Sequence, residues 1–139
     1  MTDKPSVACV LGGSGFLGQR LTDVLLEAGR EVIVADRNPS ERHAELYRHA
    51  DVCETATLRE ALAGTSIVFN LAAEWQDGVS PVERYYSVNV DGARNLCATL
   101  TEVGIRQCIF ASSVSVYPFR DEEFSEEPTP PPDSHYGRS

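Results

Sequence analysis

Three glycines near the N-terminus are spaced as in a loop that binds a phosphate group. Gly12, Gly15 and Gly18 in "GGSGFLG" follow an apolar run and open an amphipathic one. Glycine permits a positive φ at the turn and lets backbone N–H groups at a helix start approach a pyrophosphate. A third glycine allows the helix to pack closely on a sheet. A tight turn without a ligand would use the same residues, so the spacing alone leaves both interpretations open.

An acidic residue further along the chain favours the nucleotide interpretation. Asp36 ends a second apolar run, 24 residues beyond Gly12, where a carboxylate can accept hydrogen bonds from the ribose hydroxyls of an adenosine. That carboxylate would repel a 2′-phosphate, which favours NAD, whereas the neighbouring Arg37 could attract the phosphate. NAD is therefore the expected cofactor and NADP the less favoured one.

The hydropathy pattern predicts the scaffold that carries these residues. Short apolar runs alternate with longer amphipathic ones, which indicates buried strands of a parallel sheet joined by helices. We predict strands at 6–13, 31–36, 50–54, 66–73 and 105–113, and helices at 16–29, 41–48, 57–64 and 80–104. The predicted fold class is α/β, a doubly wound, Rossmann-like parallel sheet of about five strands with helices on both faces.

Composition narrows the classes of function. The chain has 139 residues, 42% of them hydrophobic and 24% charged, which is typical of one globular domain. A net charge of −9 argues against binding to nucleic acid or to an anionic membrane surface. We find no apolar run near the ~20 residues of a membrane span and no signal peptide, so a cytoplasmic location is expected. The acidic stretch 120–127 and the proline-rich stretch 126–134 are interpreted as loop.

The cysteines and histidines predict no metal site. Cys9, Cys53, Cys97 and Cys108 form no Cys-x-x-Cys pair, and three of them lie in apolar surroundings. Free, buried thiols in a reducing compartment are therefore expected. The three histidines show no ligand spacing with the cysteines, and structural or surface roles are expected for them.

Six short motifs occur in a familiar order along the chain. They are "GGSGFLG" (12–18), "ADV" (50–52), "NLAA" (70–73), "NVDGARNL" (89–96), "SSVSVY" (112–117) and "YGRS" (136–139). Together they resemble the motifs of the extended short-chain dehydrogenase/reductases, the NAD-dependent epimerase/dehydratase family. The resemblance covers essentially the whole chain, and it depends on all six motifs in register more than on any one of them.

The resemblance implies roles for particular residues. Ser113 and Tyr136 would be catalytic, with Tyr136 at the start of the family's Tyr-x-x-x-Lys motif. Asp51 would contact the adenine, and Asn89 would lie near the nicotinamide half of the cofactor. The whole set of predicted cofactor-binding residues is Gly12, Gly15, Phe16, Leu17, Gly18, Asp36, Arg37, Asp51, Val52, Leu71, Ala72, Ala73, Asn89, Ala111 and Ser112.

The two catalytic residue types suit the oxidation of a secondary alcohol, which needs a base for the hydroxyl proton and an acceptor for the hydride. Tyrosine can be that base only if its pKa falls well below ~10, and a lysine ammonium and the cationic nicotinamide ring would lower it. Ser113 would hydrogen-bond the substrate oxygen. Without the family motifs, Tyr136 would be interpreted as a loop or interface aromatic. Ser112 and Ser115 are interpreted as structural and not catalytic.

The positions after Ser113 narrow the reaction that the resemblance implies. Dehydratases of the family typically carry Asp-Glu there and decarboxylating members keep a glutamate, whereas this chain has Val114 and Ser115. Neither side chain can act as the acid or base of an elimination. A nucleotide-sugar (UDP-sugar) epimerase is expected, with a keto-reductase or alcohol dehydrogenase, or a non-catalytic NAD-binding module, as the alternatives. Trp75 could face the substrate or cover the core, and the sequence does not separate the two.

The resemblance also implies a considerably longer protein. Residues 1–139 would form the N-terminal part of a dinucleotide-binding domain that is incomplete at its C-terminus. The later strands, the substrate domain and the catalytic lysine would lie outside the chain, which would then be inactive by itself. In the family, the segment 80–104 commonly contributes to a homodimer interface, so a homodimer is expected for the full-length protein.

Overall fold

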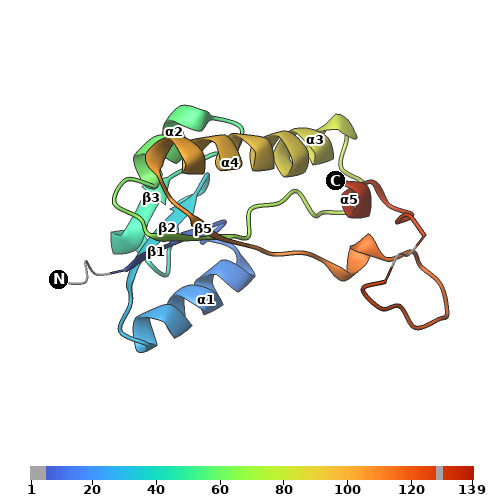
Figure 1. Ribbon diagram of the computed structural model, residues 1–139, viewed down its shortest axis with the longest axis horizontal. Coiled ribbons are helices and arrows are strands. Elements are labelled where there is room, and N and C mark those ends of the chain that lie inside the picture. The colour runs from blue at the N-terminus through green and yellow to red at the C-terminus, as the bar shows by residue number, and fades with distance from the viewer. Residues whose placement is uncertain (1–5, 128–129) are drawn as a thin grey trace.

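The computed structural model describes residues 6–127 and 130–139, and its centre is a five-stranded parallel sheet (Figure 1). The strands are β1 (Val7–Leu11), β2 (Glu31–Asp36), β3 (Tyr47–His49), β4 (Ile67–Asn70) and β5 (Gln107–Phe110). Their order is β3-β2-β1-β4-β5, so the direction of winding reverses between β1 and β4. Such a reversal opens a crevice at the carboxyl ends of the two strands. The predicted fold class is confirmed.

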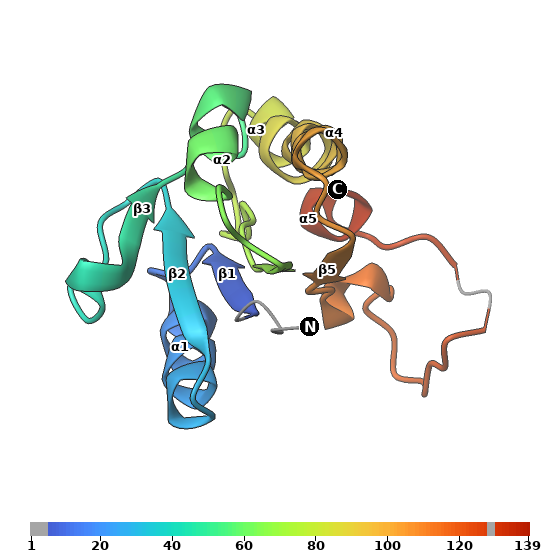
Figure 2. The same cartoon turned by 60° about the vertical axis from the view of Figure 1, so that its left-hand side comes forward.

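Helices cover both faces of the sheet. They are α1 (Phe16–Glu27), α2 (Thr55–Ala61), α3 (Glu83–Tyr86), α4 (Gly92–Val103) and α5 (His135–Arg138). Figures 1 and 2 show α1 on one side of the sheet and α2, α3 and α4 on the other. A π-helical turn, Ser87–Asp91, joins α3 to α4 into one continuous helical segment. Within the described ranges, no helix is both long and apolar enough to span a bilayer.

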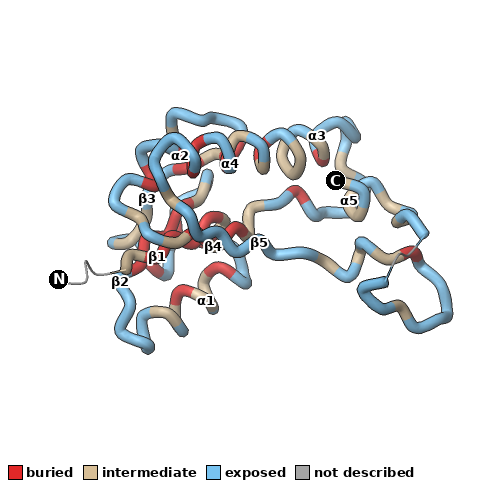
Figure 3. The backbone as a smooth tube through the Cα atoms, viewed as in Figure 1, coloured by how far each residue is buried: buried red, intermediate tan, exposed pale blue. Residues whose placement is uncertain are grey.

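The main core lies between the sheet and the pair α2 and α4. Leu58 and Leu62 of the α2 region and Leu96 and Leu100 of α4 pack against buried side chains of β1, β2 and β4. Figure 3 shows the buried positions concentrated along the strands and the inner sides of the helices. Because both sheet faces are covered, the central strands are apolar throughout, which is why they were recognisable as continuous apolar runs.

Two predicted elements differ from the structure. The prediction places the third strand at 50–54 and a helix at 41–48, whereas the strand is Tyr47–His49 and only a 3-10 turn, Ala44–Leu46, precedes it. As an edge strand, β3 pairs with β2 alone and exposes Arg48 and His49, so it carries no apolar signal. The apolar residues that prompted the prediction, Ala50 and Val52, are buried just after the chain has left the sheet.

The prediction of buried thiols holds only for Cys9. Cys53, Cys97 and Cys108 are exposed, because Cys97 lies on the solvent side of α4 and all four residues of β5 are exposed at the sheet edge. Burial raises the pKa of the Cys9 thiol to about 12. Since the unfolded chain would ionise this thiol above about pH 9 while the folded chain would not, Cys9 makes the fold less stable as the pH rises beyond that value.

We expect Cys9 to resist alkylation in the folded chain, because the thiolate is the reactive form. Brief treatment with iodoacetamide at mildly alkaline pH, followed by peptide mass spectrometry, should modify Cys53, Cys97 and Cys108 and spare Cys9. The same treatment in urea is the control and should modify all four cysteines. Labelling of Cys9 at the rate of Cys97 in the native chain would contradict the burial.

Candidate functional site

A groove with two lobes lies at the carboxyl ends of β1 and β4. The larger lobe has a volume of about 740 Å³ and the smaller one about 340 Å³. The residues that line both lobes are Gly12, Gly15, Leu71, Ala72, Ala73 and Trp75. Because the lobes share this wall, they form one elongated groove at the reversal of the strand order, which is where sheets of this class bind extended ligands.

The glycine loop forms the floor of the groove between the lobes. Gly12 has φ +81°, and a Cβ there would lie 2.7 Å from the backbone nitrogen of Ala72, so only glycine lets the β1 turn approach the segment after β4. A Cβ at Gly18 would overlap the backbone of Gly12 and Gly13. Gly15 is exposed and would meet only the Gly12 carbonyl oxygen, at 3.3 Å. The glycines at 12 and 18 are thus needed for packing, while Gly15 leaves space toward the groove.

The start of α1 is free to bind an anion. In the described structure no side chain caps its first turn, and that turn holds no acidic residue. The N–H groups at a helix start carry a partial positive charge and attract phosphate groups. Phe16 and Leu17, at the start of the helix, are 77% and 64% exposed and line the larger lobe.

The smaller lobe is lined by three acidic residues, Glu74, Asp36 and Asp51, and backbone N–H groups hold the carboxylates of the last two. Asp36 accepts hydrogen bonds from the N–H of Ser14 at 3.1 Å and from the N–H of Asn38 at 2.9 Å, which holds its carboxylate at the end of β2. Asp51 accepts one from the N–H of Cys53 at 2.8 Å. Both carboxylates therefore have fixed orientations. The predicted residues that line this lobe and not the larger one are Asp36, Arg37, Asp51 and Val52.

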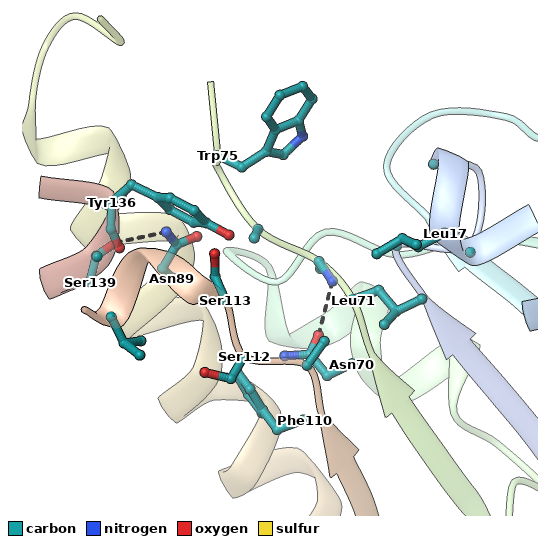
Figure 4. A pocket seen from close by; sticks show the side chains of 18 of the residues that line it. Leu17, Asn70, Leu71, Trp75, Asn89, Phe110, Ser112, Ser113, Tyr136 and Ser139 are labelled. Carbon is teal, nitrogen blue, oxygen red and sulfur yellow. Dashed lines mark hydrogen bonds between the residues drawn. The ribbon is translucent and has the colours of Figure 1, made fainter. Parts of the chain in front are cut away.

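Ser113 and Tyr136 meet in the larger lobe. Ser113 follows β5, and its Oγ accepts a hydrogen bond from the N–H of Ser115 at 3.2 Å, which caps the 3-10 turn Val114–Val116. Tyr136 lies on α5, whose first turn is capped by the Ser134 hydroxyl accepting from the N–H of Gly137 at 2.9 Å. Figure 4 shows the hydroxyls of Ser113 and Tyr136 pointing toward each other. Two hydroxyls that converge in this way can both contact one substrate oxygen.

Gly137 sets how closely α5 packs on the segment after β5. A Cβ at this position would overlap the carbonyl oxygen of Ser115 and lie 2.8 Å from Cβ of Pro132. Any side chain would therefore push α5, and Tyr136 with it, away from Ser113. Gly137 was not identified from the sequence, although a glycine directly after the predicted catalytic tyrosine was a usable signal.

Asn89 joins three parts of the site. Its Oδ1 accepts a hydrogen bond from the N–H of Glu74 at 2.7 Å, and its Nδ2 donates to the carbonyl of Glu74 at 3.0 Å and to Oγ of Ser139 at 2.8 Å. The side chain, which also lines the larger lobe, thus connects the helical segment, the loop after β4 and the end of α5. This connection was not foreseen from the sequence, where Asn89 was predicted only as a cofactor contact.

Every predicted site residue lies along this groove. Those of the larger lobe are Gly12, Gly15, Phe16, Leu17, Gly18, Leu71, Ala72, Ala73, Asn89, Ala111, Ser112, Ser113 and Tyr136. Their contacts with a ligand remain predictions. Among the described residues, no cluster of three His, Cys, Asp or Glu side chains could hold a metal ion.

Trp75, whose position the sequence left open, does not cover the core, because it is 64% exposed and lines both lobes.

The chain is similar to known proteins over nearly its whole length. The model of the NAD dependent epimerase/dehydratase family matches residues 8–139. The N-acetyl-alpha-D-glucosaminyl-diphospho-ditrans,octacis-undecaprenol 4-epimerase of Escherichia coli O157:H7 is 38% identical over 130 residues, which are 94% of this chain and 39% of that protein. The human sterol-4-alpha-carboxylate 3-dehydrogenase, decarboxylating, is 37% identical over 112 residues, covering 77% of this chain and 29% of that protein.

The chain is also similar to a solved structure of an epimerase. The UDP-glucose 4-epimerase of Thermus thermophilus, crystallised in complex with NAD, matches with a TM-score of 0.81 and 26% sequence identity, covering 95% of this chain and 46% of that one. The chain thus spans less than half the length of each of these relatives.

Proposed function

We propose that this chain, which belongs to the NAD dependent epimerase/dehydratase family, is the N-terminal, dinucleotide-binding part of a longer NAD-dependent nucleotide-sugar epimerase. The observation that carries the proposal is the pair of converging hydroxyls, Ser113 and Tyr136, in the same groove as the glycine loop. The epimerase relatives support the reaction class. The C-terminal strands and the substrate domain would belong to the longer protein.

The residues of the groove fit NAD. The uncapped start of α1 suits the pyrophosphate, the space at Gly15 allows close approach, and Asp36 in the smaller lobe suits a ribose with a free 2′-hydroxyl. When bound, NAD would supply the hydride acceptor and donor. NADP is the less favoured cofactor, because the Asp36 carboxylate would lie against its 2′-phosphate.

The chain's own residues supply the acid–base part of the reaction. Inverting a carbinol carbon through a ketone requires that the hydroxyl proton be removed and later returned at the same oxygen. Tyr136 would take and return that proton, and Ser113 would donate a hydrogen bond to the oxygen in both states; the two hydroxyls pointing toward each other support these roles. Among the described residues that line the larger lobe there is no Asp or Glu side chain, so these residues lend no support to an elimination of the dehydratase type.

A dehydrogenase is the second candidate. The larger lobe is lined mainly by apolar and aromatic side chains, among them Leu71, Trp75, Phe110 and Val116. Such a wall also suits an apolar alcohol, and a sterol dehydrogenase is among the relatives.

For the whole protein we further propose a cytoplasmic location and a homodimer that uses the helical segment from α3 to α4.

The test is an assay of the full-length gene product. Incubation with NAD and a UDP-sugar, followed by NMR of the sugar, should show the epimer accumulating without net formation of NADH. Net NADH formation from a sterol or simple alcohol, with no epimer, would favour the dehydrogenase. If the protein binds NAD but converts none of these compounds, the binding-module alternative would be favoured.

Asp36→Asn should change the choice of cofactor. Losing the negative charge weakens the hydrogen bonds to the ribose and removes the repulsion of a 2′-phosphate, so the ratio of the NAD and NADP dissociation constants should shift toward NADP by about tenfold. Calorimetry with both cofactors measures this ratio. Asp121→Asn, at an exposed position of the acidic loop, is the charge-matched control and should leave the ratio unchanged. An unchanged ratio in Asp36→Asn would place the ribose elsewhere.

A further inference from the structure

We propose that Trp75 is a specificity residue of this site, a stacking surface for the CH face of the saturated six-membered ring that carries the reacting alcohol. The inference rests on the proposed function and names the substrate contact that this part of the enzyme makes. The chemistry is shared by a pyranose and by the A ring of a sterol. We commit to the pyranose of a nucleotide-sugar, and the test distinguishes the two.

Trp75 is exposed at the place where a substrate ring has to lie. Trp75 is 64% exposed and lines the lobe that contains Ser113 and Tyr136. Figure 4 shows the indole on the segment after β4, and Trp75 lines the same lobe as the two hydroxyls. Leaving an indole of this size in water costs hydrophobic free energy, and a ligand that covers it would recover that energy.

The exposure of Trp75 does not arise from a loose loop. On one side, both backbone polar groups of Glu74 are bonded to Asn89, and the buried carboxylate of Glu74 accepts a hydrogen bond from Nε of Arg84 at 2.7 Å. On the other side, the hydroxyl of Tyr85 donates to the carbonyl of Gln76 and accepts from the N–H of Val79. The helical segment thus fixes the backbone on both sides of Trp75, so the base of the indole side chain is already held at the groove before a ligand binds.

The rest of the lobe selects the kind of ligand. Among its described lining residues the only charged side chain is Arg138, and the hydroxyls of Ser113 and Tyr136 point toward each other in it. A lobe that offers both an indole and a pair of hydroxyls suits a ring with an apolar CH face and a polar edge. A charged ligand group would find little compensation beside the indole. The lobe is therefore suited to a neutral, saturated ring alcohol.

The test is a comparison of Trp75→Ala, Trp75→Phe and Phe119→Ala in the full-length gene product. In Trp75→Ala the KM for UDP-N-acetylglucosamine should rise about tenfold or more while kcat changes much less, because the contact holds the ring in the ground state and the transition state alike. Trp75→Phe, which keeps an aromatic face, should retain most of the affinity. Phe119, 89% exposed and outside the groove, is the control for losing an exposed aromatic and should behave as wild type.

Binding measurements without turnover separate this inference from the proposed function. In a Tyr136→Phe background saturated with NAD, calorimetry should show UDP-N-acetylglucosamine binding that weakens about tenfold when Trp75→Ala is added. Binding of equal strength with and without Trp75 would overturn the inference and leave the proposed function standing. Binding of a 3β-hydroxysterol but no sugar would overturn both. A matching loss of NAD affinity in Trp75→Ala would show that the indole contacts the cofactor instead, and would also overturn the inference.

Discussion

Tyr136→Phe should lower kcat of the full-length enzyme by roughly 10²–10⁴-fold, the range for losing a positioned acid–base group. The substitution removes one oxygen and keeps the ring that packs where α5 meets the segment after β5. Because α5 is capped by the Ser134 hydroxyl, which accepts from the N–H of Gly137 and does not involve the Tyr136 phenol, the helix start should not change. Epimerisation of a UDP-sugar followed by NMR measures kcat, and thermal unfolding of the variant checks that the fold is retained.

The pH profile separates a chemical role of Tyr136 from a structural one. If Tyr136 is the base, wild-type kcat/KM should fall as the pH is lowered, and this acid limb should vanish from the residual activity of Tyr136→Phe. The control is Tyr117→Phe, because the Tyr117 ring stacks on Phe124 at 5.5 Å and phenylalanine can keep that stack. Activity of Tyr136→Phe within tenfold of wild type would remove Tyr136 from the mechanism.

The glycine loop could be predicted because its requirement is local. Gly12 needs a positive φ, and Gly12 and Gly18 both sit against backbone atoms, so the sequence has to carry glycine there whatever surrounds the loop. The buried strands could also be predicted from the sequence, since a strand in a sheet that is covered on both faces consists of a continuous run of apolar residues. An edge strand has no such demand, and β3 was placed three residues too late for that reason.

Predicting the proposed catalytic pair needed more than local patterns. Neither Ser113 nor Tyr136 has a distinctive neighbourhood, and only the ordered family motifs indicated them before their positions in the larger lobe were known. The hydrogen bonds and packing contacts that hold the site together could not be predicted from the sequence. Asn89 bonds to residues 15 and 50 positions away, and Gly137 is required by the Ser115 carbonyl from another segment. Such contacts depend on the tertiary arrangement, which no spacing in the sequence encodes.

Gly12→Ala should destabilise the chain more than Gly29→Ala, although both glycines have a similar positive φ of +81° and +72°. Alanine in the left-handed region costs roughly 1–2 kcal/mol at either site. At Gly29 nothing lies within 4 Å of an added Cβ, whereas at Gly12 the Cβ would lie 2.7 Å from the nitrogen of Ala72 and 2.8 Å from the carbonyl carbon of Leu71. Those are backbone atoms of the segment after β4, which cannot rotate away.

The difference between the two variants therefore isolates the close approach of the glycine loop to that segment. We expect the free energy of unfolding in urea to fall by about 1–3 kcal/mol more for Gly12→Ala, the usual cost of forcing a methyl group into a packed site. NAD affinity should drop for Gly12→Ala and stay at the wild-type value for Gly29→Ala, because only the first variant moves the wall that both lobes share. Equal destabilisation by the two substitutions would mean that the φ requirement alone explains Gly12, and the groove would then tolerate a wider separation of β1 and β4 than this packing implies.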